Sequence, residues 1–134
     1  MNERMTPQMV SKVAERLRAL ADENRLWLLM RLREAPANVT TLSEELDIGQ
    51  ASVSKHLGVL RQVGLVAAHR EGTQAIYQVH DESIFELCDL VCDGVVRHLE
   101  QEHAAAGLGT AAGNHESAKS TSSKRTHNKQ RSKR

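Results

Sequence analysis

Aromatic residues are almost absent from this chain. Its 134 residues include one Trp, one Tyr and one Phe, which together make up 2% of the sequence. Leu, Val, Ile and Ala must therefore fill the interior, and this mixture favours helices packed on helices. The length allows one domain with one modest core and leaves no room for a separate catalytic domain.

Long apolar runs are also lacking. No stretch of about 18 apolar residues occurs, and the N-terminus lacks the basic, apolar and small-residue order of an export signal. We therefore expect no membrane association and a cytoplasmic location. The two cysteines, Cys88 and Cys92, are too few and too close together for a secreted disulfide framework, so we expect reduced thiols.

Charge is divided unevenly along the chain. Residues 1–103 contain 11 Lys and Arg against 16 Asp and Glu, whereas residues 104–134 contain seven Lys and Arg and a single Glu. The second segment otherwise consists mainly of small and polar residues, which offer little to bury. The sequence predicts a folded domain over 1–103 and a disordered basic tail over 104–134.

Two helices are predicted first. Thr6 is a candidate N-cap, the proline after it suits the first helical position, and apolar residues at helical spacing then continue to about residue 20. Asp22 is a candidate cap for a second helix that ends at Glu34, because Pro36 cannot continue the helical hydrogen bonds. Its apolar residues leave little polar face, so we expect it to be central and buried.

A pair of shorter helices is predicted next. The run from Thr41 to Glu44 fits a capping box, which predicts a third helix that ends near Leu46. Gly49 interrupts the pattern, a fourth helix is predicted from Gln50 to Val63, and the following glycine is expected to end it in the left-handed conformation.

The remaining pattern predicts a hairpin and one long helix. Two short strands, Leu65 to Arg70 and Gln74 to Val79, flank a turn around Gly72. Asp81 is a candidate cap for a last helix that reaches at least Leu99. Its apolar stripe is longer than one small core needs, which suggests a partner helix.

The third and fourth helices have the order of a helix-turn-helix, a module that places its second helix in the major groove of DNA. Helical geometry turns Val53, Leu57 and Leu60 toward the core. The opposite side is small or hydrogen-bonding and contains no acid, as proximity to phosphate requires. It comprises Ala51, Ser52, Lys55, Gly58, Val59 and Gln62.

Individual roles follow from side-chain chemistry. Gln50 and Ser52 lie near the helix start and suit base edges, and Lys55 suits guanine or phosphate. Ser54 and Arg61 flank this face and suit backbone phosphate. The hairpin arginine, Arg70, is placed to reach a phosphate or a minor groove. Solvated surface residues without a ligand are the alternative interpretation, above all for Arg70.

The order of elements and several short motifs resemble the ArsR/SmtB family of winged helix-turn-helix regulators. The motifs are Leu20-Ala-Asp-Glu-Asn-Arg-Leu26, Ser52-Val-Ser-Lys-His-Leu57, Leu60 and Gly64-Leu-Val66. The resemblance covers about residues 10–99. It implies a homodimer built by the first and last helices, repression by operator binding, and release by an inducer. Gly49 departs from the family, which commonly has a serine cap there.

The predicted fold is therefore mainly α with a small β-hairpin, a winged helix-turn-helix of order α-α-α-α-β-β-α that dimerises through its first and last helices. The predicted function is a sequence-specific transcriptional regulator bound to a double-stranded DNA operator. The predicted DNA-binding residues are Gln50, Ser52, Ser54, Lys55, His56, Arg61, Gln62 and Arg70.

The sensor patterns of the family are missing. The third helix has no cysteine, and the last helix lacks the Asp-x-His and His-x-x-Glu combination of the zinc and nickel sensors; His98 and Glu102 are a loose fragment of it. Cys88 and Cys92 share a helix face, so a twofold axis would gather four thiols able to hold a soft metal or metalloid or to be oxidised. The alternative is that Cys88 packs as a small hydrophobe.

Other functional classes fit less well. A winged-helix module that binds another protein predicts acidic or apolar residues on the fourth helix, which Gln50, Lys55 and Gln62 do not supply. An enzyme is not expected, because the chain shows no nucleophile-base constellation, phosphate-cradling glycine loop or convincing metal set. The operator, the target genes and the inducer are not specified by the sequence.

Overall fold

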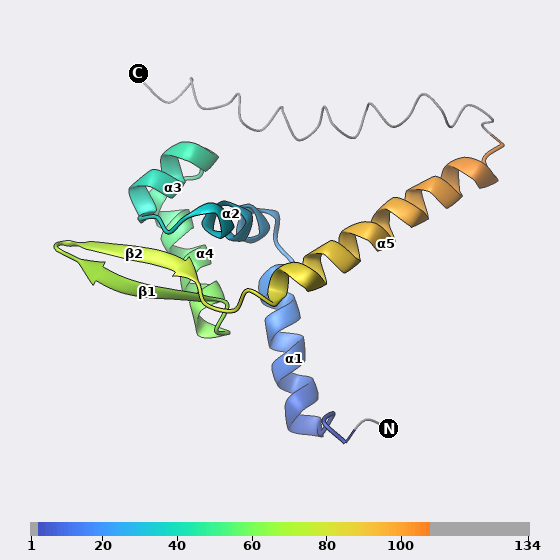
Figure 1. The fold of residues 1–134 in the computed structure, drawn as a ribbon, viewed down its shortest axis with the longest axis horizontal. Coiled ribbons are helices and arrows are strands. Elements are labelled where there is room, and N and C mark those ends of the chain that lie inside the picture. Colours follow the sequence, from blue (N-terminus) through green and yellow to red (C-terminus); the bar gives the residue numbers. More distant parts are fainter. Residues whose placement is uncertain (1–2, 108–134) are drawn as a thin grey trace. The chain divides into compact units, whose positions relative to one another are not determined.

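The computed structural model describes residues 3–107, which form five helices and a two-stranded hairpin (Figure 1). They divide into two compact units, of which the first ends at Asp81 and the second begins at Glu82. The elements are α1 (Pro7–Leu20), α2 (Glu23–Glu34), α3 (Val39–Leu46), α4 (Gln50–Gln62), β1 (Val66–Glu71), β2 (Gln74–Val79) and α5 (Ile84–Ala105). This order confirms the predicted winged helix-turn-helix.

Two of the predicted helix caps are confirmed. The Thr6 hydroxyl accepts a hydrogen bond from the Met9 amide at 3.2 Å, and an Asp22 carboxylate oxygen accepts one from the Arg25 amide at 3.1 Å. Each bond satisfies an amide that has no partner within its own helix. The end of α2 before Pro36 is also confirmed, since Ala35 is extended with φ −166° and ψ 151°.

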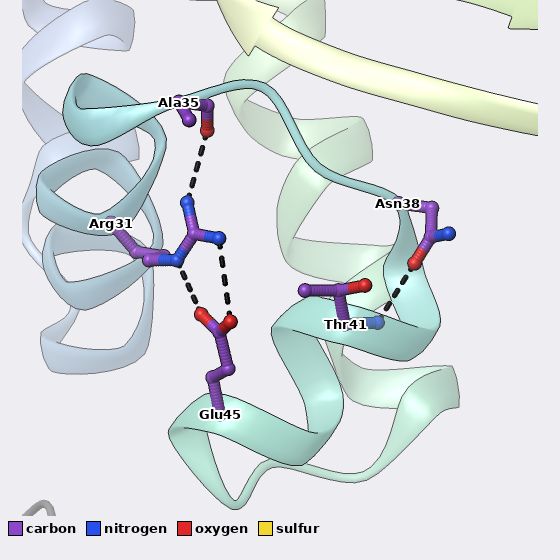
Figure 2. A network of polar contacts seen from close by, with 5 residues as sticks. All are labelled: Arg31, Ala35, Asn38, Thr41 and Glu45. Atoms are coloured by element: carbon purple, nitrogen blue, oxygen red, sulfur yellow. Dashed lines mark hydrogen bonds and ion pairs between the residues drawn. The ribbon is translucent and has the colours of Figure 1, made fainter.

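The predicted capping box is wrong. The helix α3 begins at Val39, and its N-cap is Asn38, whose side-chain oxygen accepts a hydrogen bond from the Thr41 amide at 2.8 Å (Figure 2). Thr41 thus lies inside the first turn. Asparagine is among the best N-cap residues, and its side chain reaches the third amide of the helix as well as a serine or threonine would.

The core of the first unit is aliphatic and lies between α2, α3, α4 and the hairpin. Its fully buried side chains are Leu28, Leu29, Leu42, Val53, Leu57, Leu60 and Leu65. The prediction of a central and buried α2 is wrong in part, because Leu26 and Met30 are exposed while Leu28, Leu29 and Leu32 are buried. One side of α2 therefore packs on the core and another does not.

The hairpin pairs β1 with β2 in antiparallel register from Val66 and Val79 to Glu71 and Gln74. The left-handed Gly72, with φ +61°, makes the tight turn, as glycine does without steric cost. An isolated bridge also joins Ala37 to Tyr77, with hydrogen bonds of 3.0 and 2.9 Å. The segment between α2 and α3 is therefore attached to the hairpin.

The second unit contains α5, a helix of 22 residues. Ile84 and Phe85 at its start are buried, but Leu90, Val91, Val95, Val96 and Leu99 are exposed. The expected cap Asp81 is wrong: the helix starts after Ser83 without a side-chain cap bond, and the Asp81 carboxylate is paired with Arg16.

The predicted tail falls almost entirely outside the described residues. The helix α5 continues to Ala105, two residues beyond the boundary predicted at 103, and residues 108–134 are not described. Within residues 3–107, no helix combines the length and apolar character needed to cross a membrane.

Candidate nucleic-acid interface

The helix α4 has a buried side and an exposed side. Val53, Leu57 and Leu60 are fully buried and hold the helix on α2, α3 and β1. Gly49 begins the helix without a side-chain cap bond, and the left-handed Gly64, with φ +79°, follows its last turn. The predicted inward face and the predicted left-handed glycine are both confirmed.

The exposed side of α4 carries most of the predicted contact residues. Gln50, Ser54, Lys55, Arg61 and Gln62 are exposed, whereas Ser52 is partly buried. No Asp or Glu occurs within the helix, and Arg61 places a cation in its last turn. This side thus offers hydrogen-bond donors and two cations without a carboxylate to repel phosphate.

The turn between α3 and α4 is held by local hydrogen bonds. Asp47 ends α3 in the left-handed region with φ 54°. The Ser43 hydroxyl donates to the Ile48 carbonyl at 2.5 Å, and the Ile48 amide donates to the Ser43 carbonyl at 3.2 Å. These bonds fix the short connection that sets the angle between the two helices.

His56 differs from the other predicted contact residues, because its side chain is only 14% exposed. An Arg25 guanidinium nitrogen lies 3.3 Å from its Nδ1, and an Asp22 carboxylate oxygen lies 4.0 Å from the same atom. The guanidinium can only donate, so its contact with His56 is a hydrogen bond in the tautomer that carries the ring proton on Nε2. His56 thereby links α4 to the start of α2.

Arg25 is the centre of this link. Its Nε donates to the Ala19 carbonyl at 2.5 Å, which satisfies an open acceptor at the end of α1. The hydrogen bond from the backbone amide of Arg25 holds the pKa of Asp22 below its usual range, and the positive charge of Arg25 acts in the same direction against the effect of burial. The sequence showed the Asp22 cap but not the contact between Arg25 and His56.

The hairpin presents Arg70 at its exposed tip. One guanidinium nitrogen of Arg70 donates to the Thr73 carbonyl at 3.3 Å across the turn. His69 and Glu71 form an exposed pair at 3.2 Å. Arg70 is therefore held near the turn, on the exposed end of the hairpin.

A second arginine, Arg31, joins α2 to α3 (Figure 2). It forms an ion pair with Glu45 and donates to the Ala35 carbonyl at 3.0 Å. The hydrogen bond that Arg31 donates to the Glu45 carboxylate raises the pKa of Arg31 above its usual range. Asn38 also donates to the Gln74 side chain at 2.9 Å, so the segment between these helices is tied to the hairpin. Sequence reasoning missed both links, since no periodicity marks such pairs.

Candidate metal ligands are dispersed. Within residues 3–107, no cluster of three or more His, Cys, Asp or Glu side chains is arranged to hold a metal ion. Cys88 is partly buried and Cys92 exposed, and the two are not joined in a disulfide. His98 lies 3.5 Å from Glu102 on the surface of α5, in the pairing expected for residues four apart.

Comparisons with known proteins agree with this geometry. Residues 22–68 match the family model described as bacterial regulatory protein, arsR family. The chain is 40% identical over 96 residues to the HTH-type transcriptional regulator NmtR of Mycobacterium tuberculosis, covering 72% of this chain and 77% of the relative. It is also 35% identical to the biofilm growth-associated repressor of Agrobacterium fabrum, covering 59% and 68%.

A solved structure shows the same likeness. The homodimeric winged helix-turn-helix DNA-binding domain Mb0332 from Mycobacterium bovis aligns with a TM-score of 0.64 and 30% identity, covering 77% of this chain and 94% of that one. With the NmtR match and the family model, this likeness shows that the chain belongs to the ArsR family of bacterial regulatory proteins and is a DNA-binding transcriptional regulator.

Proposed function

We propose that the chain is a homodimeric repressor that binds a palindromic operator through α4 and the β1–β2 hairpin, and that leaves the DNA when an inducer binds. The observation that carries this proposal is the exposed, acid-free side of α4, set on a fully buried apolar side. A helix fixed in this way can enter the major groove without losing its position on the core.

The proposed contacts keep the roles expected from the sequence. Gln50 and Ser52 read base edges, Lys55 contacts guanine or phosphate, and Ser54, Arg61 and Gln62 border them. Arg70 contacts the backbone or minor groove from the hairpin. His56 belongs to this set as the residue that connects it to Asp22 and Arg25.

Exposed apolar residues support the dimer. On α1 they are Met9, Val10, Val13 and Leu17, and on α5 they are Leu90, Val91, Val95, Val96 and Leu99. Exposed large apolar side chains that gather on one helix are typical of association surfaces. The M. bovis domain, which is homodimeric, supports a second copy as the occupant.

For the inducer site we propose Cys88 and Cys92. The residues lie one helical turn apart in α5, and one thiol is exposed. Two copies would bring four thiols together, enough for a soft metal, a trivalent metalloid or oxidation. Arsenite or peroxide added to a complex of the protein with DNA should release wild-type protein but not Cys88→Ser. Equal behaviour of the two proteins would exclude this site.

The remaining assignments concern the whole chain. We propose that residues 1–103 form the DNA-binding and dimerisation domain, that residues 104–134 add contacts to phosphate without reading sequence, and that the protein works in the cytoplasm, where the chromosome is accessible. The charge of the last segment supports its role, because it contains seven Lys and Arg and one Glu.

Footprinting on the DNA upstream of its own coding sequence tests the function. We expect two protected half-sites whose centres are about 34 Å apart, because a twofold dimer places its two recognition helices one helical turn apart. Transcription in vitro from the same fragment should fall when the protein is added. Absence of protection at low salt would contradict operator binding, and increased transcription would contradict repression.

A further inference from the structure

Arg16 connects α1 to two segments of the first unit that are distant in sequence. From α1, its Nη2 donates to the Val63 carbonyl at 2.8 Å, 47 positions away in sequence. Its Nη1 lies 2.6 Å from an Asp81 carboxylate oxygen, 65 positions away. A single planar guanidinium thus serves two partners in fixed directions, as its fork of donors permits.

The first partner is the end of α4. Val63 is the C-cap residue, and no amide of the helix donates to a carbonyl at that position. A cation at this end also complements the helix dipole. Gly64 assists the approach: its φ is +79°, and a Cβ atom on it would lie 3.3 Å from Arg16 Nη2. Glycine therefore provides both the turn and space for the guanidinium.

The two partners also bracket the hairpin. Val63 precedes the start of β1 by three residues, and Asp81 follows the end of β2 by two. Between them, the His80 amide donates to the Leu65 carbonyl at 2.9 Å and closes the base of the hairpin. Arg16 consequently joins α1, the end of α4 and the segments that precede β1 and follow β2.

We propose that Arg16 is a positioning residue for operator recognition, which fixes the angle between α4 and the wing without touching DNA. This inference rests on the proposed function. With α4 in the major groove, the distance between the bases under Lys55 and the backbone under Arg70 depends on that angle. When this angle is fixed, the contacts of α4 and those of the hairpin form together on one DNA sequence. On other DNA sequences the two sets do not fit at once, and affinity is lower.

The test uses the full chain and a duplex that the wild-type protein selects from a randomised pool, with a scrambled duplex of equal composition for comparison. The variants are Arg16→Gln, Arg16→Lys and the matched control Arg18→Gln, an exposed arginine of the same helix. For each, affinity for both duplexes is measured over a range of salt concentrations, and folding is followed by thermal melting.

We expect Arg16→Gln to lower the preference for the selected duplex roughly fivefold, with affinity for the scrambled duplex and the salt slope unchanged. Arg16→Lys should resemble Arg16→Gln, because one ammonium keeps the charge but not the two-directional fork. Arg18→Gln should keep the wild-type preference.

Three results with the Arg16 variants would overturn the proposal. Unchanged preference in folded Arg16→Gln removes any positioning role, and full recovery by Arg16→Lys reduces the role to charge. Equal loss of affinity on both duplexes, with a salt slope smaller by about 0.9, would make Arg16 a phosphate contact.

If Arg16→Gln does not fold, Asp81→Asn replaces it, and an unchanged preference of that variant for the selected duplex overturns the proposal. Failure of the wild type to select any duplex would instead refute the proposed function.

Discussion

The exposed sides of α4 and α5 differ in chemistry although each belongs to a helix with a buried portion. Exposed residues of α4 are mostly polar or cationic and include no acid, whereas α5 exposes Leu90, Val91, Val95, Val96 and Leu99 among several acids. The first surface suits a polyanion, and the second suits another apolar surface. Exposure alone therefore does not identify a partner; the chemistry of the exposed residues does.

The two surfaces also differ in support. The exposed side of α4 lies over three fully buried aliphatic residues, and hydrogen bonds to α1 and α2 fix its end and its middle through Arg16 and Arg25. Over Leu90–Leu99, α5 has no buried residue. A surface that reads DNA must be rigid before binding, whereas a dimer surface can gain its order when two copies associate.

The largest effect should come from the apolar surface of α5. Replacing Val91 and Val95 together by Gln removes apolar area without adding charge, so we expect a monomer and a loss of operator affinity of at least about 100-fold, because both half-sites no longer bind as one unit. Size-exclusion chromatography and a binding assay measure this. Glu100→Gln, on the same helix, should change neither, and a dimeric double variant would contradict an α5 interface.

Placing an acid on α4 should have the next largest effect. Lys55→Glu replaces an exposed cation by an anion against phosphate, and we expect operator affinity to fall roughly 30-fold. Lys12→Glu changes charge equally on α1 and serves as the control in the same binding assay. If both substitutions weaken binding equally, net charge rather than the α4 surface governs affinity.

Removal of residues 108–134 tests whether DNA affinity depends on more than α4. This segment carries seven Lys and Arg and one Glu. We expect about tenfold weaker binding at low salt and a salt slope reduced by about 0.9 for each phosphate that the shortened protein no longer neutralises, with the preference for operator over scrambled DNA retained. Disappearance of that preference would show that the segment reads sequence.

The support behind α4 should depend on Asp22. Asp22→Ala removes the cap of α2, and we expect the free energy of unfolding to fall by about 1 kcal/mol in urea titrations.

Because the folded state lowers the pKa of Asp22, the contribution of its carboxylate charge to stability is complete above about pH 4 and is lost as pH falls through the folded pKa. The stability difference between wild type and Asp22→Asn should therefore shrink at pH 3. A constant difference would contradict this.

The smallest effect should come from Gly49, the N-cap of α4. Its backbone has φ −56° and ψ 143°, and a Cβ atom there would meet nothing within 4 Å. Gly49→Ser should therefore stabilise the fold by a few tenths of a kcal/mol, since serine adds a cap hydrogen bond. A shift of the midpoint in urea measures it; a lower midpoint would show that serine does not adopt the cap geometry.

Most elements of the fold could be predicted because their signals are local. Thr6, Asp22, Pro36 and Gly64 each act on the backbone within a few residues, and α4 ended one residue from its predicted limit. The start of α3 could not be predicted correctly, because Asn38 and Thr41 both suit an N-cap and only the packing of Leu42 and the bridge at Ala37 select the first.

The faces of α4 in the candidate site could be predicted from the sequence, but the polar contacts behind the helix could not. The inward and outward residues of α4 follow from helical periodicity, which the buried Val53, Leu57 and Leu60 confirm. Asp81 shows the limit of sequence reasoning. Its position before α5 suits a helix cap, yet its carboxylate pairs with Arg16. An acid before a helix has several partners available, and the nearest donor in space, not in sequence, decides among them.

Sequence by itself determined the helices, the hairpin, the acid-free side of α4 and the apolar stripe of α5, because periodicity and turn chemistry act over a few residues. Tertiary structure decided the partners of three arginines. Arg16 and Arg31 contact carboxylates 65 and 14 positions away, and Arg25 contacts a carbonyl at the end of the preceding helix. An arginine carries five donors on a long, flexible side chain, so its partners are fixed only when packing brings an acceptor within reach.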